Sequence, residues 1–452
     1  MLCCFIRRGV SWRNGALIVF SLIFYAWGEP VVVFLMLTTV AVNYEAALLM
    51  NRRRRKIILI AAIVFDIAML LVFKYSGFLV ETLNALPGIS LPVPNIALPI
   101  GISFYTFQVV SYIVDIYRGE VEPQTSFPRL LLYVSMFPQL VAGPIVRYGH
   151  IAREIGKREP DFKDICAGMN RFACGLAKKA ILANICGSLS ATYMDSAHFG
   201  SLSVMGAWFG LLMYTLEIYF DFSAYSDMAI GMGRMLGFRY HENFRYPYIA
   251  QSVTEFWRRW HISLSSFFRD YVYIPLGGSR KGRIRNLLIV WALTGLWHGA
   301  SWNFVLWGLW YFVFIALEKP VLNRVLKAAP RPLRHLYLML VVMLGWVWFY
   351  FTDMGEMVAF LGRLFGVGAA GFIDMGLRLE VTNNVFFIFV ALLACFPVVR
   401  VLKQHCARFA RRSAKAEHVI FLLRCAVTGA LLLAGTVLLV GNSYNPFIYF
   451  RF

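Results

Sequence analysis

Long apolar stretches separated by short polar segments follow one another along the whole chain. An α-helix needs roughly 20 apolar residues to cross a bilayer. The clearest stretches that approach this length are residues 57–73, 204–220, 335–351, 384–399 and 419–440. Two shorter ones, 16–28 and 98–114, suit tilted, hairpin or half-buried helices. The pattern predicts an all-α integral membrane protein with about ten spans, forming one membrane domain over residues 1–452.

Composition supports a membrane environment. Of the 452 residues, 59% are hydrophobic and only 15% are charged, whereas a soluble domain carries about 25% charged residues. The formal net charge of +20 would suggest nucleic acid for a soluble protein. Here the basic residues gather between apolar stretches, as lysine and arginine do in cytoplasmic loops. The clusters are residues 52–56, 147–163, 280–285, 319–334 and 400–415. We therefore expect a lipid bilayer around the chain and no nucleic-acid partner.

The charge clusters also predict an orientation. Residues 75–96 contain no lysine or arginine, so we expect them outside the cytoplasm. The alternation then places the segments 147–163, 241–285 and 400–418 inside, and 353–383 and the last twelve residues outside. For the number of membrane crossings to agree with this orientation, residues 129–146 must enter the membrane and return to the same side. Pro138, Gly143 and Pro144 suit such a re-entrant segment, which is tolerated where protein shields it from lipid.

The cysteines predict neither a disulfide framework nor a metal site. Of the eight, two form Cys3-Cys4 and six are scattered without a C-x-x-C pair. Cysteine inside an apolar helix usually behaves as a small apolar residue. The first 13 residues do not resemble a cleavable signal, because a hydrophobic hairpin broken at 28–30 follows them directly.

The first candidate for chemistry is His298, which follows the apolar run 286–295. About twelve helical residues carry it about 18 Å from the basic loop 280–285, toward the middle of the hydrocarbon layer. Burial there keeps the imidazole neutral and able to accept a proton. Small residues at 299–301 would leave room for a substrate, and Trp297 and Trp302 would form walls. The competing interpretation is a core histidine bonded to a backbone carbonyl.

The second candidate is the aromatic and charged segment 255–265, which continues to Arg269 and Asp270. It suits an amphipathic helix at the cytoplasmic interface or in a cavity. His261 would lie one turn after Trp257 on the same face. It would line a substrate passage or, with nearly equal weight, extend toward water as an interfacial residue.

A glycine-rich basic turn follows at residues 275–282. Gly277 and Gly278 beside Arg280 and Lys281 would suit a phosphate-rich acyl donor such as coenzyme A, although a plain basic turn explains the composition as well. The Walker spacing is absent, which argues against an NTPase.

Acidic residues accompany the apolar run at 204–220. Glu217, Asp221 and Tyr225 are four residues apart and would share one helix face, with Asp227 close by. We favour a structural role for them, in ion pairs with Arg258 or Arg259, over a polar wall.

Together these motifs resemble the membrane-bound O-acyltransferase (MBOAT) family, in its alginate O-acetyltransferase branch. The most specific pieces are Arg-Trp-His-Ile-Ser at 259–263 and Trp-His-Gly-Ala at 297–300. Similarity runs from about residue 11 to the C-terminus, and further matching segments are 99–108, 137–145, 221–227 and 445–452. Members of this branch usually begin with another apolar segment before the part that matches 11–15, and we expect either a misplaced start or a lost span.

The resemblance implies a multi-helix bundle with re-entrant segments and a central tunnel, with core motifs at 97–310 and C-terminal spans and tail at 319–452. It implies that His298 is the catalytic base, with His261 as a second, less certain catalytic residue. A cytoplasmic thioester, acetyl-CoA by our expectation, would meet a polysaccharide acceptor without a bound cofactor or metal. The residues expected to line the tunnel or bind the donor are Trp257, Arg258, Trp260, Ser263, Arg269, Asp270, Gly277, Gly278, Arg280, Lys281, Trp297 and Asn303.

The tail Phe-Ile-Tyr-Phe-Arg-Phe at 447–452 resembles the end of a small partner peptide in teichoic-acid D-alanylation systems. Tyr449 is therefore a candidate acyl relay to an extracytoplasmic O-acetyltransferase partner. The competing interpretation is an aromatic belt at the membrane interface.

Other functions remain open at this point. D-alanyl transfer from a carrier protein is the nearest alternative, although the turn at 275–285 favours coenzyme A. A transporter of acyl groups or glycan precursors would have broken helices in paired halves, and the sequence lacks that symmetry. A scaffold in a secretion complex leaves a buried His298 unexplained. We expect a multi-pass protein of the bacterial cytoplasmic membrane.

Overall fold

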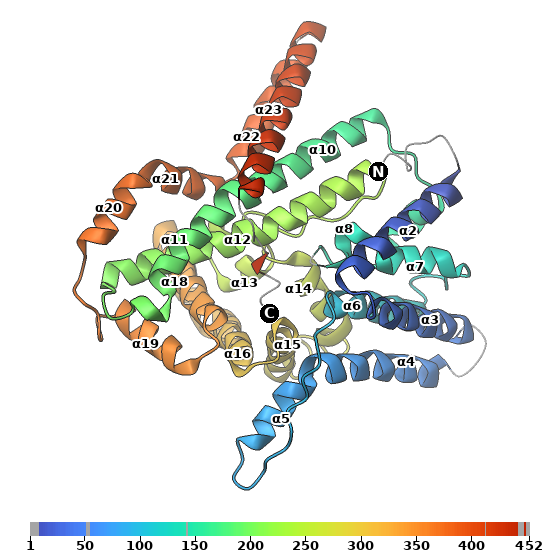
Figure 1. Ribbon diagram of the computed structural model, residues 1–452, viewed down its shortest axis with the longest axis horizontal. Coiled ribbons are helices and arrows are strands. Elements are labelled where there is room, and N and C mark those ends of the chain that lie inside the picture. Colours follow the sequence, from blue (N-terminus) through green and yellow to red (C-terminus); the bar gives the residue numbers. More distant parts are fainter. Residues whose placement is uncertain (1–8, 51–54, 142, 412, 442–446, 449–452) are drawn as a thin grey trace. The chain divides into compact units, whose positions relative to one another are not determined.

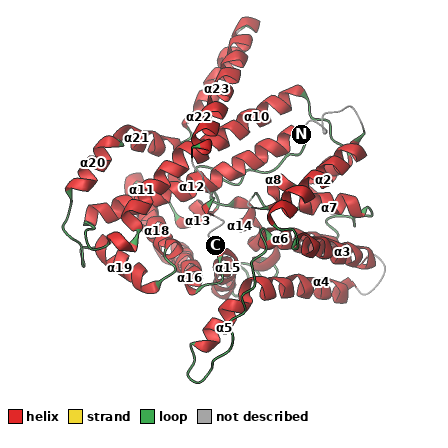
Figure 2. Ribbon diagram, viewed as in Figure 1, coloured by secondary structure: helices red, strands yellow, loops and turns green. Residues whose placement is uncertain are grey.

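The computed structural model describes residues 9–50, 55–141, 143–411, 413–441 and 447–448. Over these residues the chain consists of helices and loops, without a strand (Figure 2). The expected all-α fold is thereby confirmed. The chain divides into two compact units, which are described separately. A single domain over 1–452 stays a prediction.

Unit 1 comprises Met1–Met169, Ala229–Glu242 and Ser266–Pro275. Within it α2 packs on α7, and α3, α4 and α6 pack on one another (Figure 1). Its helices and short helical turns are α2 (Val10–Gly28), α3 (Val33–Met50), α4 (Arg55–Leu70), η1 (Leu71–Tyr75), α5 (Ser76–Asn84), α6 (Ile102–Arg118), α7 (Phe127–Ser135), α8 (Phe137–Leu140), α9 (Tyr148–Gly156) and η5 (Arg269–Tyr273). It also contains parts of α10 (Phe162–Ala177), α12 (Val204–Met235) and α14 (Ile262–Phe268), which continue into unit 2.

Unit 2 comprises Asn170–Met228, Asn243–Ser265 and Leu276–Phe452. Its remaining elements are η2 (Lys178–Ala183), α11 (Asn184–Met194), η3 (Ser196–His198), η4 (Pro247–Ile249), α13 (Val253–Trp257), α15 (Arg283–His298), α16 (Trp302–Leu317), η6 (Glu318–Leu322), α17 (Asn323–Ala328), α18 (Arg331–Tyr350), α19 (Met354–Leu364), α20 (Met375–Asn383), α21 (Val385–Ala394), α22 (Val398–Ala410) and α23 (Ala414–Val440).

Two glycines let α15 and α16 approach closely in unit 2. A Cβ on Gly308 would lie 2.2 Å from the carbonyl oxygen of Trp291. A Cβ on Gly295 would lie 2.3 Å from that of Phe304. Small residues serve this purpose at helix contacts in membranes. Because the backbones touch at these points, α16 and its neighbour α18 hold the end of α15 in a fixed place.

Among the described residues, six helices are long and apolar enough to cross a membrane, or up to seven if one bent pair counts as a span. They are Val33–Met50, Arg55–Asn84, Phe162–Met194, Trp302–Leu322, Arg331–Tyr350 and Ala414–Val440. The sequence pattern predicted a larger number of spans, about ten. The bent pair, α20 and α21, meets at 66° just before the expected span 384–399. That range is shared by two helices, because α21 ends at Ala394 and α22 begins at Val398. α6, with 17 residues, is shorter than a full span.

The segment expected to re-enter the membrane, residues 129–146, falls within unit 1. It contains most of α7, which has nine residues, and all of α8, which has four. The helix breaks at Met136, immediately before Phe137 and Pro138. Neither helix is long enough to cross a bilayer. Two short helices joined by a break are what we expect of a re-entrant segment.

Candidate active site

His298 is the last residue of α15, and aromatic rings surround its imidazole. The centroids of Trp297, Trp307 and Phe349 lie 4.8, 4.9 and 5.2 Å from that of the imidazole. The side chain is buried, with 7% exposure. The helix leading away from the basic turn and the burial of His298 are both present as expected. Its role as a base stays a prediction.

The small residues after His298 do not leave the open space that we expected. A Cβ on Gly299 would lie 2.2 Å from the Phe304 ring. Gly299 therefore allows the chain to pack tightly against α16 where it leaves α15. Trp302 is 53% exposed, and its role as a wall stays a prediction. Trp307 on α16 and Phe349 on α18 flank the imidazole.

His261 lies between α13 and α14, where the expected continuous helix is interrupted. Its φ of 42° is left-handed, a conformation that is uncommon for residues other than glycine. The side chain is fully buried at 0% exposure, which rules out an interfacial histidine facing water. Its Nε2 has no hydrogen-bond partner among the described residues, and the Phe222 ring lies 4.7 Å away.

Asn243 fixes the turn that carries His261, and no motif in the sequence pointed to this residue. Its carbonyl oxygen accepts a hydrogen bond from the N–H of Ile262 at 3.0 Å. Its Oδ1 accepts from the N–H and the hydroxyl of Ser263 at 3.0 and 2.9 Å. The Ser263 hydroxyl in turn lies 3.4 Å from Nδ1 of His261. Asn243 is buried, so these bonds hold the imidazole in a defined place.

Trp297 brings the two candidate histidines together. Its ring centroid lies 5.8 Å from that of His261 and 4.8 Å from that of His298. All three residues belong to unit 2. The two motifs that sequence analysis treated separately therefore form one aromatic and histidine cluster.

Buried polar atoms without a partner among the described residues concentrate in this region. Besides Nε2 of His261 they are Nε1 of Trp257, Trp307 and Trp346, the hydroxyl of Tyr311 and Oδ1 of Asn303. Trp307 connects most of them, since the centroids of Trp257 and Tyr311 lie 5.6 and 5.3 Å from its own. Buried polar groups in proteins are nearly always hydrogen-bonded. A polar substrate could satisfy these atoms, and binding of a substrate here stays a prediction.

The other predicted site residues of unit 2 differ in burial. Trp257 and Trp260 are buried, and Trp260 packs on Trp346 at 5.1 Å. Asn303 is buried and donates to the carbonyl oxygen of Trp348 at 3.2 Å. Arg258 is exposed, so it does not line the aromatic cluster.

The glycine-rich turn before α15 is closed by its own hydrogen bonds. The amides of Arg280 and Lys281 both donate to the carbonyl oxygen of Gly277. Asn286 donates from Nδ2 to the carbonyl oxygens of Gly278 and Lys281 at 2.9 and 2.8 Å. Gly277 has a φ of 106°, which favours glycine. These two amides are therefore engaged within the turn, while the side chains of Arg280 and Lys281 are exposed, and their binding of a donor stays a prediction.

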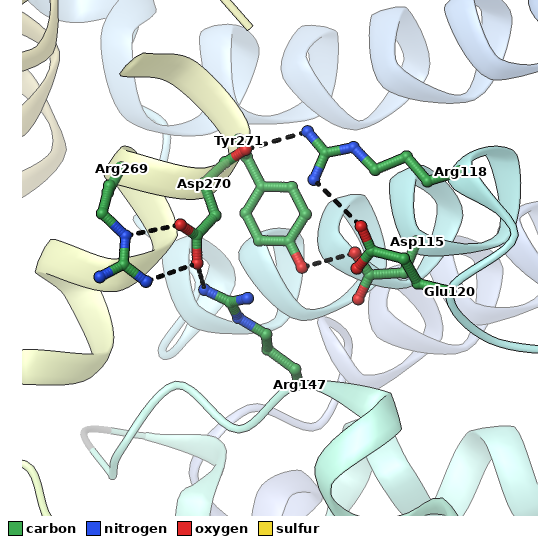
Figure 3. Close-up of polar contacts among 7 residues, drawn as sticks. All are labelled: Asp115, Arg118, Glu120, Arg147, Arg269, Asp270 and Tyr271. Atoms are coloured by element: carbon green, nitrogen blue, oxygen red, sulfur yellow. Dashed lines mark hydrogen bonds and ion pairs between the residues drawn. The ribbon is translucent and has the colours of Figure 1, made fainter. Parts of the chain in front are cut away.

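Arg269 and Asp270 belong to unit 1, where they join an ion-pair network (Figure 3). Asp270 accepts from Arg269 at 2.6 and 3.0 Å and from Arg147 at 2.7 Å. Burial pushes the pKa of Asp270 upward, but the hydrogen bonds from Arg269 and Arg147 outweigh it and hold that pKa below its ordinary value.

Tyr271 completes this network. Figure 3 shows its ring between the guanidinium groups of Arg118 and Arg147, at 5.2 and 4.9 Å. Its hydroxyl donates to Asp115 at 2.7 Å. Arginine over an aromatic ring is a favourable contact. The network thus attaches η5 to α6, and a donor-binding role for Arg269 and Asp270 stays a prediction.

The acidic residues of α12 have structural partners, but not those that we expected. Asp221 pairs with Lys179, and Asp227 pairs with Lys178 and Arg171. These basic residues come from η2 and α10 rather than from the segment 258–259. Arg259 pairs instead with Glu255 one turn before it. Tyr449 lies outside the described residues.

From the burial of His261 we predict that the stability of the folded protein depends on pH. Burial lowers its pKa from 6.5 to about 3, and it lies outside the candidate spans. Below pH 6.5 the unfolded chain binds a proton here that the folded chain does not, so stability falls as the pH drops. At pH 5 the loss is about 2 kcal/mol relative to pH 8. Thermal unfolding in detergent at the two pH values, compared with His261→Asn, measures it. An unchanged pH dependence in that variant would contradict the assignment.

The fold and the site together define a class of protein. It is a helical membrane protein with two buried histidines in an aromatic cluster. The family model for MBOAT, the membrane-bound O-acyltransferase family, matches residues 120–355. The chain belongs to this family and is an acyltransferase.

Two relatives match over nearly their whole length. The chain is 35% identical to the probable alginate O-acetylase AlgI of Azotobacter vinelandii over 480 residues, covering 98% of this chain and 95% of that protein. It is 28% identical to the peptidoglycan O-acetyltransferase of Helicobacter pylori, covering 96% and 91%. The match to the teichoic acid D-alanyltransferase of Bacillus subtilis is 29% and covers 50% and 60%.

Proposed function

We propose that this enzyme transfers an acetyl group from cytoplasmic acetyl-CoA toward a polysaccharide acceptor on the outer side of the bacterial cytoplasmic membrane. The observation that carries the proposal is the buried cluster of His298, Trp297 and His261, within the segment that the family model matches. The relatives that match almost end to end are an alginate O-acetylase and a peptidoglycan O-acetyltransferase. The D-alanyltransferase matches half of the chain, which favours an acetyl group over D-alanine.

In the proposed reaction, Nε2 or Nδ1 of His298 accepts the proton of an acceptor hydroxyl. The oxygen attacks the thioester carbonyl, and an O–C bond forms as the C–S bond breaks. The coenzyme A thiolate leaves and receives the proton from the imidazolium, giving an ester and the free thiol. Such general-base assistance contributes about 10²–10⁴-fold.

Helix α15 connects the proposed donor-binding turn with the proposed catalytic base. Its 16 residues span about 24 Å, from the basic turn with Arg280 and Lys281 to His298. A donor whose phosphates contact the exposed basic side chains would extend its thioester along the helix toward the imidazole. Tyr449 is the proposed relay from there to an extracytoplasmic O-acetyltransferase partner.

The test uses the purified full-length protein in liposomes with radiolabelled acetyl-CoA. Alginate oligosaccharides or peptidoglycan fragments serve as acceptors, with and without the partner transferase. We expect release of coenzyme A coupled to label in the glycan or, without the partner, in the protein. A parallel reaction contains a D-alanyl carrier protein. Label from the carrier but none from acetyl-CoA would contradict the proposed donor.

A further inference from the structure

Phe447 and Ile448, near the C-terminus, lie in unit 2 next to a buried ion pair. Lys179 on η2 donates from Nζ to Oδ1 of Asp221 on α12 at 2.5 Å. The two side chains are 7% and 3% exposed. The backbone N–H of Ile448 donates to the other oxygen, Oδ2 of Asp221, at 2.8 Å. The same carboxylate thus contacts both the ion-pair partner and the C-terminal segment.

Side chains hold the same segment from two directions. Nζ of Lys179 lies 4.8 Å from the centroid of the Phe447 ring, as in a cation–π contact. Tyr225, one turn after Asp221 on α12, meets the Phe447 ring edge-on at 5.0 Å. Ile448 itself is buried, with 7% exposure. Phe447 and Ile448 therefore pack as part of the folded unit.

The buried ion pair of Lys179 and Asp221 is well suited to hold a backbone N–H of the C-terminal segment. A buried ion pair stabilises a protein only when further hydrogen bonds satisfy its remaining atoms. The N–H of Ile448 supplies such a bond to Asp221, and a hydrogen bond to a charged group is stronger than one between neutral groups.

A neighbouring pair shows that ion pairing alone does not require the tail. Asp227, on the same helix, has Lys178 on one oxygen at 2.5 Å and Arg171 on the other at 2.6 Å. Both of its oxygens are occupied by side chains. At Asp221, Lys179 bonds one oxygen and the backbone N–H of Ile448 bonds the other.

We infer that Lys179 and Asp221 form a docking site for the protein's own C-terminal segment and so position the end of the chain during acyl transfer. Docking follows from the contacts themselves. The consequence for transfer rests on the proposed function. In this role Lys179 and Asp221 are positioning residues, which act through the tail and not on the reacting atoms.

Docking is tested by hydrogen exchange of the full-length protein in detergent, followed by mass spectrometry of the C-terminal peptide. In Asp221→Asn we expect protection of this peptide to fall by about tenfold, the loss of one charged hydrogen bond. The matched control is Asp227→Asn, which removes a neighbouring charge on α12 without touching the tail. Equal protection in wild type and Asp221→Asn, or equal loss in both variants, would overturn the docking site.

Because one charge of a buried pair left alone is strongly destabilising, a second variant guards against misfolding. Lys179→Met combined with Asp221→Leu replaces the pair by apolar side chains of similar size, which proteins generally tolerate. It removes the acceptor for the Ile448 amide, so we again expect an exposed tail in a folded protein. Retained protection in this variant would count against the site.

The effect on transfer is tested separately with Ile448→Pro, which leaves the ion pair intact but removes the N–H donor. We expect kcat for transfer to the acceptor to fall about tenfold, with the KM for the donor unchanged and the protein still folded, at a lower melting temperature. Unchanged transfer with an undocked tail would overturn the positioning role. A wild-type protein without any transfer would instead contradict the proposed function, and the exchange result would still decide the docking.

Discussion

Replacing His298 with alanine is expected to lower acyl transfer by about 10²–10⁴-fold, the usual contribution of a general base. The imidazole is buried at the end of α15, and the rings of Trp307 and Phe349 enclose it. Alanine cannot accept the proton of an acceptor hydroxyl, while α15 and its contact with α16 remain. The loss should therefore appear in kcat, with the KM for the donor nearly unchanged.

The measurement is acceptor-dependent release of coenzyme A by purified protein in liposomes. His405→Ala is the matched control, because His405 is exposed on α22 and its Nδ1 lies 2.9 Å from the carbonyl oxygen of Val401 on the same helix. We expect full activity in that variant. The melting temperature of both variants shows whether the fold is retained. Full turnover by His298→Ala would remove His298 from the mechanism.

The sequence predicted α15 and its histidine well because one strong pattern decides each. The apolar run after the basic turn predicts the helix. A histidine at the end of such a run is expected to be buried with it. α18 and α23 were found for the same reason. The expected span at 384–399 was less accurate, since composition alone does not place the break between α21, which ends at Ala394, and α22, which begins at Val398.

The arrangement around His261 could not be predicted from periodicity. A helical pattern runs through residues 255–265, and the interruption before Ile262 depends on tertiary contacts. Asn243, nearly twenty residues earlier, holds the turn through three hydrogen bonds. Such long-range side-chain bonds leave no mark in a local pattern. They decide whether His261 faces water, as one interpretation had it, or the Trp297 ring.

The partners of the acidic residues were missed for a related reason. Lys178 and Lys179 lie in a π-helical segment, η2, where one extra residue per turn shifts the face that a side chain occupies. A regular helix would not present both neighbours to α12. Arg269 and Glu318 also lie in π-helical segments. Some of the charged side chains with structural partners, Lys178, Lys179, Arg269 and Glu318, therefore lie in segments that depart from regular α-helix geometry.

Glu318→Ala is expected to disrupt the fold around His261. Glu318 follows α16 and is buried. Its carboxylate accepts hydrogen bonds from the N–H of Val253 and from the N–H and hydroxyl of Thr254, the first residues of α13. It thus holds the helix that leads through Trp257 to His261.

Each buried donor left without an acceptor costs about 1–3 kcal/mol, so three donors together give a loss of about 3 kcal/mol or more. We expect a lower melting temperature and a loss of transfer that Glu318→Gln partly restores, because the amide oxygen still accepts. Glu255→Gln is the control on the same helix, where the Glu255–Arg259 pair is 37% and 32% exposed and contributes less than about 1 kcal/mol. Thermal unfolding and gel filtration of the three variants measure the difference. If Glu318→Ala and Glu255→Gln proved equally stable, α13 would be held by its aromatic packing on Trp291 and Trp307 rather than by the Glu318 carboxylate.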